Sequence, residues 1–582
     1  MERKANEDLD LDNQEWQQAL QIIQYTRHSL FLTGKAGTGK STFLRYIAKN
    51  TKKKYVILAP TGIAAINAGG QTMHSFFKLP FHPLLPNDSR YSPRNIRKTL
   101  KYSGVTLKLL RELELIIIDE ISMVRADIID FIDKVLRIYC RNMREPFGGK
   151  QLLLVGDIFQ LEPVVKEDEW RLMQPFYASA YFFAAKVWQQ MQLVSIELRK
   201  VYRQSDAKFI SLLDRIRMNQ VTDQDLAAIN ARYNAQDTLH DRGHLEITLA
   251  TRRDTVDWIN EQKLSEIEGS SITFHGTIHG EFPLTSLPAP MDLEVKPGAQ
   301  VIFTRNDKEK RWVNGTIGIV TGYDLEEGII GVCDEDGNEY DVCMEVWENM
   351  RYTFDEKEQK IVEEQLGSFV QYPLRLAWAI TVHKSQGLTF RQVKIDFSGG
   401  GAFAGGQTYV ALSRCTSLKG ITLEEPIRHS DIFVRPEVVH FAQHYNDSQL
   451  MRQVLFESKA DREYHDAVEA FDRQDFDSFL KNFFLAIHSR YDIERPHVQR
   501  YIRRKLGIIS RQQNHIKELE TEIQRRDEML KRLAAEYVLL GKECEQEHMN
   551  DAAIRNYQKA LDLYPEAFEA QRRIQKLKAN KK

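Results

Sequence analysis

Apolar residues along the first third of the chain recur in short runs that are separated by amphipathic stretches. The runs at 30–33, 55–58, 115–118 and 152–155 are almost continuously apolar and have the length of strands. Strands of this kind, alternating with helical segments, are typical of a parallel sheet that helices cover on both faces. The pattern therefore predicts βαβ units and an α/β core.

Two segments depart from this alternation. Residues 78–102 carry four prolines together with basic residues, which predicts an inserted loop or minidomain. Residues 297–348 have the pattern of short alternating strands, with Asp336 and Gly337 as a hairpin turn. We interpret this second segment as a small β-barrel inserted into a second α/β core. That core would consist of residues 194–264 and 373–423.

Beyond about residue 431 the chain becomes helical and strongly charged. Ile509, Ile516, Ile523 and Leu530 repeat every seven residues, which predicts a long helix. Polar residues interrupt the second apolar position of this seam, so a coiled-coil dimer stays an open alternative.

One tetratricopeptide-like repeat follows the long helix, and a weaker match precedes it near 464–487. A stable array usually needs about three repeats, so one good repeat predicts a helical appendage that either packs on the rest of the chain or binds a protein partner. The positions that fit the repeat are Tyr537, Leu540, Gly541, Ala553, Tyr557, Ala560 and Pro565.

The chain has 582 residues, enough for about three to five domains. Hydrophobic residues make up 42% and charged residues 28%, and no apolar run approaches the roughly 18 residues that a membrane span needs. Residues 1–12 are acidic and polar and lack the basic and apolar segments of a signal peptide. We therefore expect a cytoplasmic (or nuclear) protein with no membrane partner.

Charge and cysteine content narrow the classes further. The 80 basic residues balance the 82 acidic ones, so any case for nucleic-acid binding depends on local sites. The five cysteines are scattered and form no CxxC pair, which excludes a zinc ribbon or a dithiol redox site of that pattern. They are Cys140, Cys333, Cys343, Cys415 and Cys544.

Residues 34–41 fit the pattern GxxxxGK[ST], follow a predicted strand and open a helical stretch. In a P-loop, glycines let backbone N–H groups turn inward around phosphate oxygens, a lysine such as Lys40 supplies positive charge, and a hydroxyl such as that of Ser41 ligates magnesium. The structural alternative is a glycine turn before a helix. The order of strand, loop and helix favours the P-loop. Its phosphate-binding residues would be Gly34, Gly37, Thr38, Gly39, Lys40, Ser41 and Thr42.

Two further strands end in polar residues suited to nucleotide chemistry. The strand predicted at 115–118 delivers Asp119 and Glu120, of which the first can hold magnesium and the second can polarise the attacking water. The strand predicted at 152–155 leads to Gln160, which can touch the γ-phosphate. Adjacent acids are common on protein surfaces, but downstream of a P-loop they predict a nucleoside triphosphatase.

These strings stand in a fixed order with several others, which are residues 33–41, 59–65, 72–77, 119–124, 147–151, 156–164, 198–204, 314–315, 381–387 and 409–414. Taken together, the chain resembles the Pif-type (petite integration frequency) DNA helicases of superfamily one, whose members translocate from five prime to three prime. The resemblance covers roughly residues 13–423.

The resemblance implies a motor driven by ATP and Mg²⁺, in which two RecA-like P-loop cores close around the nucleotide. Arg203 and Arg414 would lie on the second core and reach the γ-phosphate, where guanidinium groups neutralise developing charge. With Lys40, Glu120 and Gln160 they would complete the catalytic set.

One family position departs from the pattern. The family's adenine-reading glutamine has no clear counterpart here, because Gln14, Gln17 and Trp16 all stand near the expected place.

The resemblance also implies a track for single-stranded DNA across both cores. Residues 78–102 would form the strand-separating wedge and residues 297–348 the small β-barrel. Phe76 and Phe77 can equally be core residues, and for Phe77 we favour the core. The residues that would contact the sugar-phosphate backbone or stack on bases are Pro60, Thr61, His74, Phe76, His383, Lys384 and Ser385.

By this resemblance the chain contains a first RecA-like core (1–190) and a second (191–430). The all-helical extension (431–582), expected from the residue pattern, lies outside the resemblance. The implied activity is an ATP-dependent helicase, a monomeric motor that unwinds forked or structured duplex DNA in repair, recombination or telomere maintenance. Two alternatives stay open. The chain can be a translocase that displaces bound proteins without opening duplexes, or a scaffold that recruits partners through its helical extension.

Overall fold

The computed structural model describes residues 12–579, apart from 81, 205, 234–244, 310, 356–359, 399–400, 403, 491–493 and 495. The acidic start predicted for residues 1–12 lies almost wholly outside the described residues. The chain divides into two compact units between Asn482 and Phe483. None of the helices in the described part of the chain combines the length and the apolar character that crossing a bilayer would need.

The first unit contains a six-stranded parallel sheet with the order β3-β2-β4-β5-β1-β6. The four apolar runs predicted as strands correspond to β1, β2, β4 and β5, so the predicted parallel sheet is confirmed. The strands are β1 (Leu30–Gly34), β2 (Tyr55–Ala59), β3 (Gln71–Thr72), β4 (Leu115–Ile118), β5 (Gln151–Val155) and β6 (Val194–Leu198).

Helices cover both faces of this sheet because successive strand residues point to opposite sides. Ile116 and Ile118 enter an apolar cluster with α7, whereas Ile117 enters a cluster with α1 and α2. The helices of this region are α1 (Gln14–Tyr25), α2 (Lys40–Asn50), α3 (Gly62–Ala68), α4 (Met73–Phe77), α5 (Ile96–Thr99), α6 (Gly104–Glu112), α7 (Ala126–Tyr139) and α8 (Glu167–Met173).

Strand β6 corrects one prediction. We assigned residues 194–198 to the second core, but β6 pairs in parallel with β1 from Val194 opposite Leu30 to Leu198 opposite Gly34. Its apolar side chains complete the edge of the first sheet. The pattern alone was ambiguous because α/β segments flank the strand on both sides.

A second, four-stranded parallel sheet has the order β18-β7-β19-β20. Helix α9 packs its apolar side on this sheet, since Phe209 and Leu213 share an apolar cluster with Leu249. The elements are β7 (Ile247–Ala250), β18 (Ala379–Thr381), β19 (Val393–Asp396), β20 (Ile421–Leu423), α9 (Ala207–Arg217), α10 (Asp223–Asn230), α11 (Arg253–Glu266) and α12 (Gln407–Leu412).

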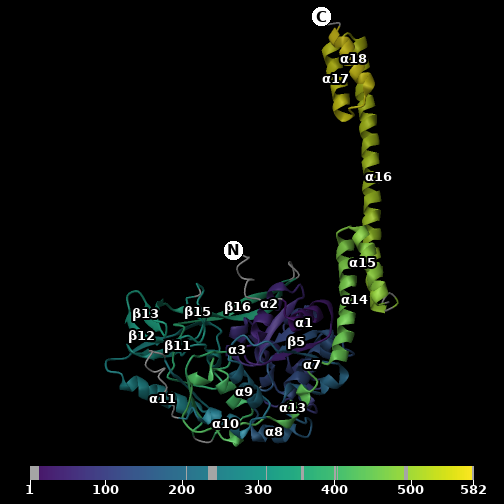
Figure 1. Cartoon of the computed structure of the whole chain (residues 1–582). Coiled ribbons are helices and arrows are strands. Elements are labelled where there is room, and N and C mark those ends of the chain that lie inside the picture. The colour runs from purple at the N-terminus through teal and green to yellow at the C-terminus, as the bar shows by residue number, and fades with distance from the viewer. Residues whose placement is uncertain are drawn as a thin grey trace. The chain divides into compact units, whose positions relative to one another are not determined.

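The segment predicted as a β-barrel contributes to a five-stranded antiparallel sheet with its own apolar cluster, in the order β14-β13-β12-β11-β17 (Figure 1). The hairpin turn predicted at Asp336 and Gly337 is confirmed, because Asp334 and Asn338 face each other there and Gly337 has φ +81°. The strands are β11 (Gln300–Phe303), β12 (Ile317–Asp324), β13 (Ile329–Asp334), β14 (Glu339–Val342) and β17 (Leu374–Leu376).

A long antiparallel hairpin, β15 (Glu345–Asp355) and β16 (Lys360–Gln371), extends from this region and pairs with β9 (Thr277–Gly280). Tyr352 of the hairpin reaches the first sheet, where its hydroxyl accepts a hydrogen bond from Ile57 N at 3.3 Å. A small two-stranded sheet joins β8 (Ile272–His275) to β10 (Asp292–Val295).

Residues 431–482, which we grouped with the helical extension, belong to the first unit. They include α13 (Pro436–Ala442) and α14 (Ser448–Asp472). Met451 and Val454 of α14 join the apolar cluster of α1 and the first sheet. This part of the extension therefore packs on the first α/β core.

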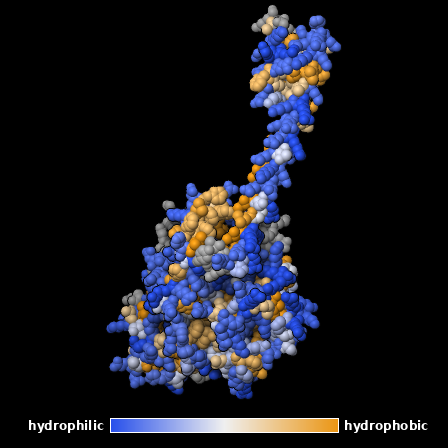
Figure 2. Space-filling model, turned by 90° about the vertical axis from the view of Figure 1, so that its right-hand side faces the viewer, coloured by the Kyte–Doolittle hydropathy of each residue, from blue (hydrophilic) through white to orange (hydrophobic). Residues whose placement is uncertain are grey.

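The second unit consists of helices. α15 (Phe476–Ser489) crosses the boundary, and α16 (Pro496–Gln546), α17 (Asn550–Leu563) and α18 (Phe568–Ala579) follow. The long helix predicted from the heptads is confirmed by α16, whose surface is mostly hydrophilic (Figure 2). At the predicted repeat, Gly541 of α16 leaves room for the buried ring of Tyr557 of α17.

Candidate active site

The P-loop follows β1 and ends where α2 begins. Gly37 and Gly39 have φ values of +81° and +86°, a backbone conformation that favours glycine. A side chain at Gly37 would also collide with Arg203. Gly39 is the N-cap of α2, so backbone N–H groups at the start of this helix point into the loop.

Lys40 lies inside the loop. Its Nζ donates hydrogen bonds to the carbonyl oxygens of Gly34 at 2.7 Å and Lys35 at 3.0 Å. Burial lowers the pKa of Lys40, while the carboxylates of Asp157 and Glu120 act in the opposite direction. The loop thus encloses the positive charge of Lys40, which an anion bound in the loop would neutralise.

The predicted acid pair stands at the carboxyl end of β4. Glu120 adopts φ +51°, and its N–H donates to Asp119 Oδ1 at 2.9 Å. Burial and the neighbouring Asp119 carboxylate raise the pKa of Glu120 to about 7, and burial also raises the pKa of Asp119. Both carboxylates therefore lie in a confined site in which a bound cation would stabilise their charged forms.

Gln160 is joined to this acid pair through a residue outside the predicted set. Gln386, which lies beyond β18, donates from Nε2 to Glu120 Oε2 at 2.8 Å and to Gln160 Oε1 at 3.4 Å. Gln160 in turn donates to Asp157 Oδ2 at 3.2 Å. Residues from the two sheets therefore share one hydrogen-bonded network.

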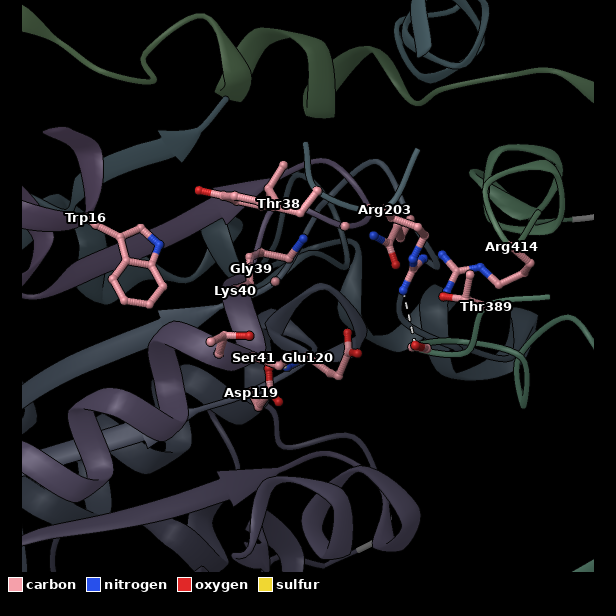
Figure 3. Close-up of a pocket in the computed structure, with 17 residues that line it drawn as sticks. Trp16, Thr38, Gly39, Lys40, Ser41, Asp119, Glu120, Arg203, Thr389 and Arg414 are labelled. Atoms are coloured by element: carbon pink, nitrogen blue, oxygen red, sulfur yellow. Dashed lines mark hydrogen bonds between the residues drawn. The ribbon is translucent and has the colours of Figure 1, made fainter. Parts of the chain in front are cut away.

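Arg203 and Arg414 face Lys40, Asp119 and Glu120 across a cavity of about 600 Å³ (Figure 3). Arg203 Nη2 donates to Gly387 O at 3.1 Å, whereas its buried Nη1 has no hydrogen-bond partner among the described residues. Burial lowers the pKa of both arginines. The pKa of Arg414 falls to about 9, because the neighbouring charge of Arg203 lowers it further.

Arg414 differs from Arg203 in its hydrogen bonds. The Arg414 guanidinium donates to backbone oxygens of Val410, Ser385 and Leu388. Its position is thus fixed within the second sheet's part of the site.

The cavity brings together every predicted catalytic residue and all of the predicted phosphate-binding residues except Gly34, which lies behind Lys40. Trp16 lines its far end, with its ring edge-on to Phe43 at 5.2 Å (Figure 3). Gln14 and Gln17 are exposed and do not line it. Of the three residues considered for the base-reading position, Trp16 is the one at the cavity.

A second cavity of about 450 Å³ shares Ser41, Asp119, Glu120 and Gly387 with the first. Among the residues predicted to contact DNA, three line it: Thr61, His383 and Lys384. Partial enclosure at the cavity wall, together with the charges of Arg375 and Arg253, lowers the pKa of Lys384 to about 8, although much of this side chain still meets solvent. Burial lowers the pKa of His383.

The other predicted DNA contacts do not line this cavity. Phe76 is 5% exposed and packs edge-on against Phe77 at 4.8 Å, so both phenylalanines belong to the core. Ser385 is fully buried, and its Oγ donates to Val382 O at 2.8 Å. Pro60 and His74 are half-buried on the first core, outside the cavity lining.

The residues of the first cavity fit a nucleoside triphosphate with Mg²⁺. The unpaired Arg203 Nη1 and Lys40 offer cationic donors to phosphate oxygens. Ser41 and Asp119 offer the hydroxyl and carboxylate oxygens that Mg²⁺ prefers. A glycine-lined loop at a helix N-terminus supplies backbone donors in addition.

Sequence reasoning missed Gln386 and Arg375 as site residues. Gln386 stands inside the string 381–387, so its place in that string was an available signal. Arg375 follows a proline and an apolar residue in β17 and carries no local signal.

Comparison with known proteins agrees with this geometry. A family profile described as PIF1-like helicase matches residues 12–226. The ATP-dependent DNA helicase Pif1 of Campylobacter jejuni is 32% identical over 405 residues, which cover 67% of this chain and 87% of that relative. The chain belongs to the PIF1-like helicase family.

The match spans less than two thirds of the length of several vertebrate relatives in the PIF1-like helicase family. The human ATP-dependent DNA helicase PIF1 is 34% identical over 466 residues, which cover 78% of this chain. The chain spans 65% of the length of that relative, and 58% of the rat and zebrafish relatives.

Solved structures of the family have the same fold. Bacteroides sp Pif1 in complex with ADP-AlF4 is 39% identical with a TM-score of 0.69, and the match covers 76% of this chain and 98% of that one. The crystal structure of Bacteroides Pif1 bound to ssDNA matches with a TM-score of 0.55 over the same shares. The PIF1-like α/β helicase fold, with its parallel sheet core, is therefore shown for this chain.

Proposed function

We propose that this chain is an ATP-dependent DNA helicase that translocates from five prime to three prime on single-stranded DNA and unwinds duplex or structured DNA. The observation that carries the proposal is the convergence of Lys40, Asp119 and Glu120 with Arg203 and Arg414 across one cavity. The structures of the related Bacteroides protein with ADP-AlF4 and with ssDNA support it.

We interpret the two parallel sheets as RecA-like cores and the antiparallel sheet with its own apolar cluster as the family's small β-barrel. The division into residues 1–190, 191–430 and 431–582 is kept as a working description with two changes: β6 moves to the first core, and residues 431–482 pack on that core. In this interpretation the motor acts as a monomer in the cytoplasm. Its free cysteines suit a reducing compartment.

The residues of the first core that line the nucleotide cavity each have their own task in the proposed hydrolysis. Lys40 and the loop amides bind phosphate oxygens, and Ser41 with Asp119 would hold Mg²⁺. The ion would neutralise charge that develops on the phosphoryl group. Glu120 accepts a proton from the attacking water, and Gln160 senses the terminal phosphate. The hydrogen bonds of Gln386 to Glu120 and Gln160 keep both side chains directed at the same region.

Arg203 and Arg414 couple hydrolysis to movement. Guanidinium groups at the terminal phosphate raise phosphoryl-transfer rates by about 10³ to 10⁵ where an arginine finger has been measured. Because Arg414 belongs to the second core, and Arg203 beside the P-loop donates to Gly387 O of that core, closure of the two cores is needed for full hydrolysis. Loss of the terminal phosphate removes the contacts that favour closure, and the cores open again.

We assign the second cavity to the DNA track. It is lined by residues of both cores, and it shares the wall formed by Ser41, Asp119 and Glu120 with the nucleotide cavity. In this proposal, a movement of these shared side chains when one cavity binds its ligand changes the wall of the other cavity. Lys384 and Arg375 supply positive charge for the sugar-phosphate backbone.

The primary test is ATP hydrolysis with no nucleic acid, single-stranded DNA, duplex DNA or RNA, at several salt concentrations. The wild type and Lys40→Ala are compared, with Lys49→Ala on the exposed side of α2 as the matched control. Strong stimulation by single-stranded DNA that weakens with salt and is lost only in Lys40→Ala supports a DNA-coupled motor. Hydrolysis that no nucleic acid changes overturns the proposal.

Polarity and unwinding are tested with duplexes that carry a single-stranded tail at either end. The proposal expects strand separation with a five-prime tail and little with a three-prime tail. ATP-dependent displacement of a bound protein without strand separation would favour the translocase alternative.

A further inference from the structure

Helix α9 packs on the second sheet, but two of its charged side chains, Asp214 and Arg217, bind residues of the first core. Arg217, which is 3% exposed, donates from Nη2 to Asp157 Oδ1 at 3.0 Å and from Nη1 to Glu197 Oε1 at 3.1 Å. One turn earlier, Asp214 accepts a hydrogen bond from Lys35 of the P-loop at 2.6 Å. The helix therefore contacts both the P-loop and the end of β5.

The site around Arg217 is built for a guanidinium group. Its Nε also donates to Asp157 Oδ1 at 3.3 Å, and its carbon centre lies 4.2 Å from the ring centroid of Phe159. A planar, forked cation can satisfy a carboxylate and stack on an aromatic ring at the same time. A lysine at this position would keep the charge and lose the fork.

Asp157 links Arg217 to the residues proposed for hydrolysis, because it binds both Arg217 and Gln160. Its Oδ1 accepts from Arg217 and from Phe159 N, while its Oδ2 accepts from Gln160 Nε2 at 3.2 Å. Gln160 and Glu120 are then joined by Gln386. A continuous chain of polar contacts thus runs from α9 to Glu120.

The chain of contacts is enclosed rather than solvated. Asp157 is 1% exposed, and Tyr409 and Tyr445 approach the same cluster, with Lys40 also within electrostatic reach of Asp157. In such surroundings the direction of the Asp157 carboxylate depends on its few partners, because water cannot replace one that moves.

We propose that Arg217 is a positioning residue. Through Asp157 it fixes the side chain of Gln160, so that the seat of α9 on the first core determines whether Gln160 and Glu120 are aligned for hydrolysis. This inference rests on the proposed function, because it concerns how closure of the two cores is communicated to the hydrolytic site.

The test compares steady-state ATP hydrolysis of the wild type and Arg217→Lys, with and without single-stranded DNA. Arg215→Lys is the matched control, since Arg215 lies on the same helix and pairs with Asp225 away from the cavity. We expect Arg217→Lys to lower the DNA-stimulated kcat by about tenfold or more while the KM for ATP changes by less than about threefold. Arg215→Lys should change neither value.

A double-mutant cycle separates positioning from folding. Arg217→Met takes away the cationic partner of the buried Asp157 carboxylate and is expected to lower the melting temperature. Arg217→Met with Asp157→Asn removes both charges and should recover much of it. If Arg217 acts through Asp157, the two single variants and the double variant lose kcat by similar factors. If the losses multiply, or if kcat recovers together with the melting temperature, the positioning role is overturned.

The same assay keeps this inference apart from the proposed function. If the wild type hydrolyses ATP but no nucleic acid stimulates it, the helicase proposal fails and the basal kcat of the variants decides the role of Arg217. A lower basal kcat at unchanged KM then upholds the positioning role, and an unchanged basal kcat overturns it. A wild type without any hydrolysis overturns both.

Discussion

Gln386 donates a hydrogen bond of 2.8 Å to Glu120, although 266 positions separate the two residues in the chain. Glu120 follows a strand of the first sheet, and Gln386 follows a strand of the second. The same amide also reaches Gln160. The residue proposed to activate water is therefore oriented by a side chain from the opposite core, which makes its alignment sensitive to closure of the cleft.

Replacing Gln386 by alanine should slow hydrolysis more than it weakens nucleotide binding. A hydrogen bond to a charged group contributes about 1.5 to 3 kcal/mol, so we expect a loss in kcat of roughly tenfold to a hundredfold with little change in KM. Steady-state kinetics with single-stranded DNA measures both values. Gln262→Ala, on the exposed side of α11, is the control. An equal rise in KM at constant kcat would show that Gln386 serves binding instead.

Binding of single-stranded DNA should weaken as pH rises through about 8. Partial enclosure and the neighbouring arginines lower the pKa of Lys384 to about 8. The lysine is therefore charged below this pH and loses its charge above it, so phosphate contacts are lost in the alkaline range. Fluorescence anisotropy between about pH 7 and pH 9 checks this, because ordinary lysines stay charged there.

The matched variant for this pH effect is Lys384→Arg, since a guanidinium remains charged throughout that range. Its affinity should change little with pH, while Lys419→Arg, at an exposed position, should keep the wild-type dependence. A wild-type affinity that is constant over the range would rule out Lys384 as the titrating contact.

Phe76 should behave as a core residue and not as a base-stacking residue. Its ring is 5% exposed and lies among Phe77 and Tyr352. Phe76→Ala is expected to lower the free energy of unfolding by about 3 to 5 kcal/mol, as deletion of a buried aromatic ring does. Denaturant unfolding measures this, with Phe456→Ala, 57% exposed on α14, as the control. A stable variant with selectively weaker DNA binding would contradict the core assignment.

Much of the fold was predictable from the sequence, because the patterns that indicate strands and turns depend on neighbouring residues. The apolar runs at β1, β2, β4 and β5 and the turn at Gly337 depend on neighbouring residues only, and the structure has them where they were predicted. Strand β6 was assigned to the wrong sheet because its partner, β1, lies far away in the sequence.

The residues proposed to bind and hydrolyse the nucleotide could be predicted from the sequence, but the residues that hold them in place could not. Asp119 and Glu120 directly follow a strand, and Lys40 stands where the P-loop meets α2, so local pattern and spacing identify all three. Arg217 and Gln386 form hydrogen bonds with residues that follow strands of another sheet, and only the folded chain brings these partners together. Exposure likewise depends on packing. Ser385, predicted as a DNA contact, is therefore buried, and Phe76, which the sequence left open between core and DNA contact, lies in the core.

The base of the nucleotide should be selected weakly. Trp16 lines the far end of the cavity, and an indole offers a ring face and one N–H donor but no acceptor for the 6-amino group of adenine. Stacking tolerates any base. We expect kcat/KM values for ATP and GTP that agree within about tenfold, since large discrimination requires hydrogen bonds to the distinguishing group.

Two variants test this role of Trp16. Trp16→Ala should lower kcat/KM for both nucleotides by similar factors, and Trp16→Gln should shift the ratio toward ATP. Trp258→Ala, 63% exposed on α11, should change neither. A preference of the wild type for ATP above about a hundredfold would show that another group reads the base.

Residues 78–102 were predicted to form a wedge, and deleting them would be a poor test of it. Leu84, Tyr91 and Ile96 of this segment are buried in the core of the first sheet, and Leu84 N donates to Asp127 at 2.8 Å. A deletion would therefore expose that core. Arg94 and Lys98 are exposed on the same segment and can be changed without disturbing it.

Arg94→Ala combined with Lys98→Ala should reduce the rate of strand separation by about threefold to tenfold, because exposed cations at a junction hold the phosphates of the strand that is being excluded. ATP hydrolysis stimulated by single-stranded DNA should stay within about twofold, because neither residue lines the nucleotide cavity or the proposed DNA track. Unwinding of a five-prime-tailed duplex and ATPase rates are measured on the same preparations. Arg144→Ala with Lys419→Ala, two other exposed cations, is the control. Equal losses in unwinding and in stimulated hydrolysis would mean that the segment supports the motor as a whole, and unchanged unwinding would locate strand separation elsewhere.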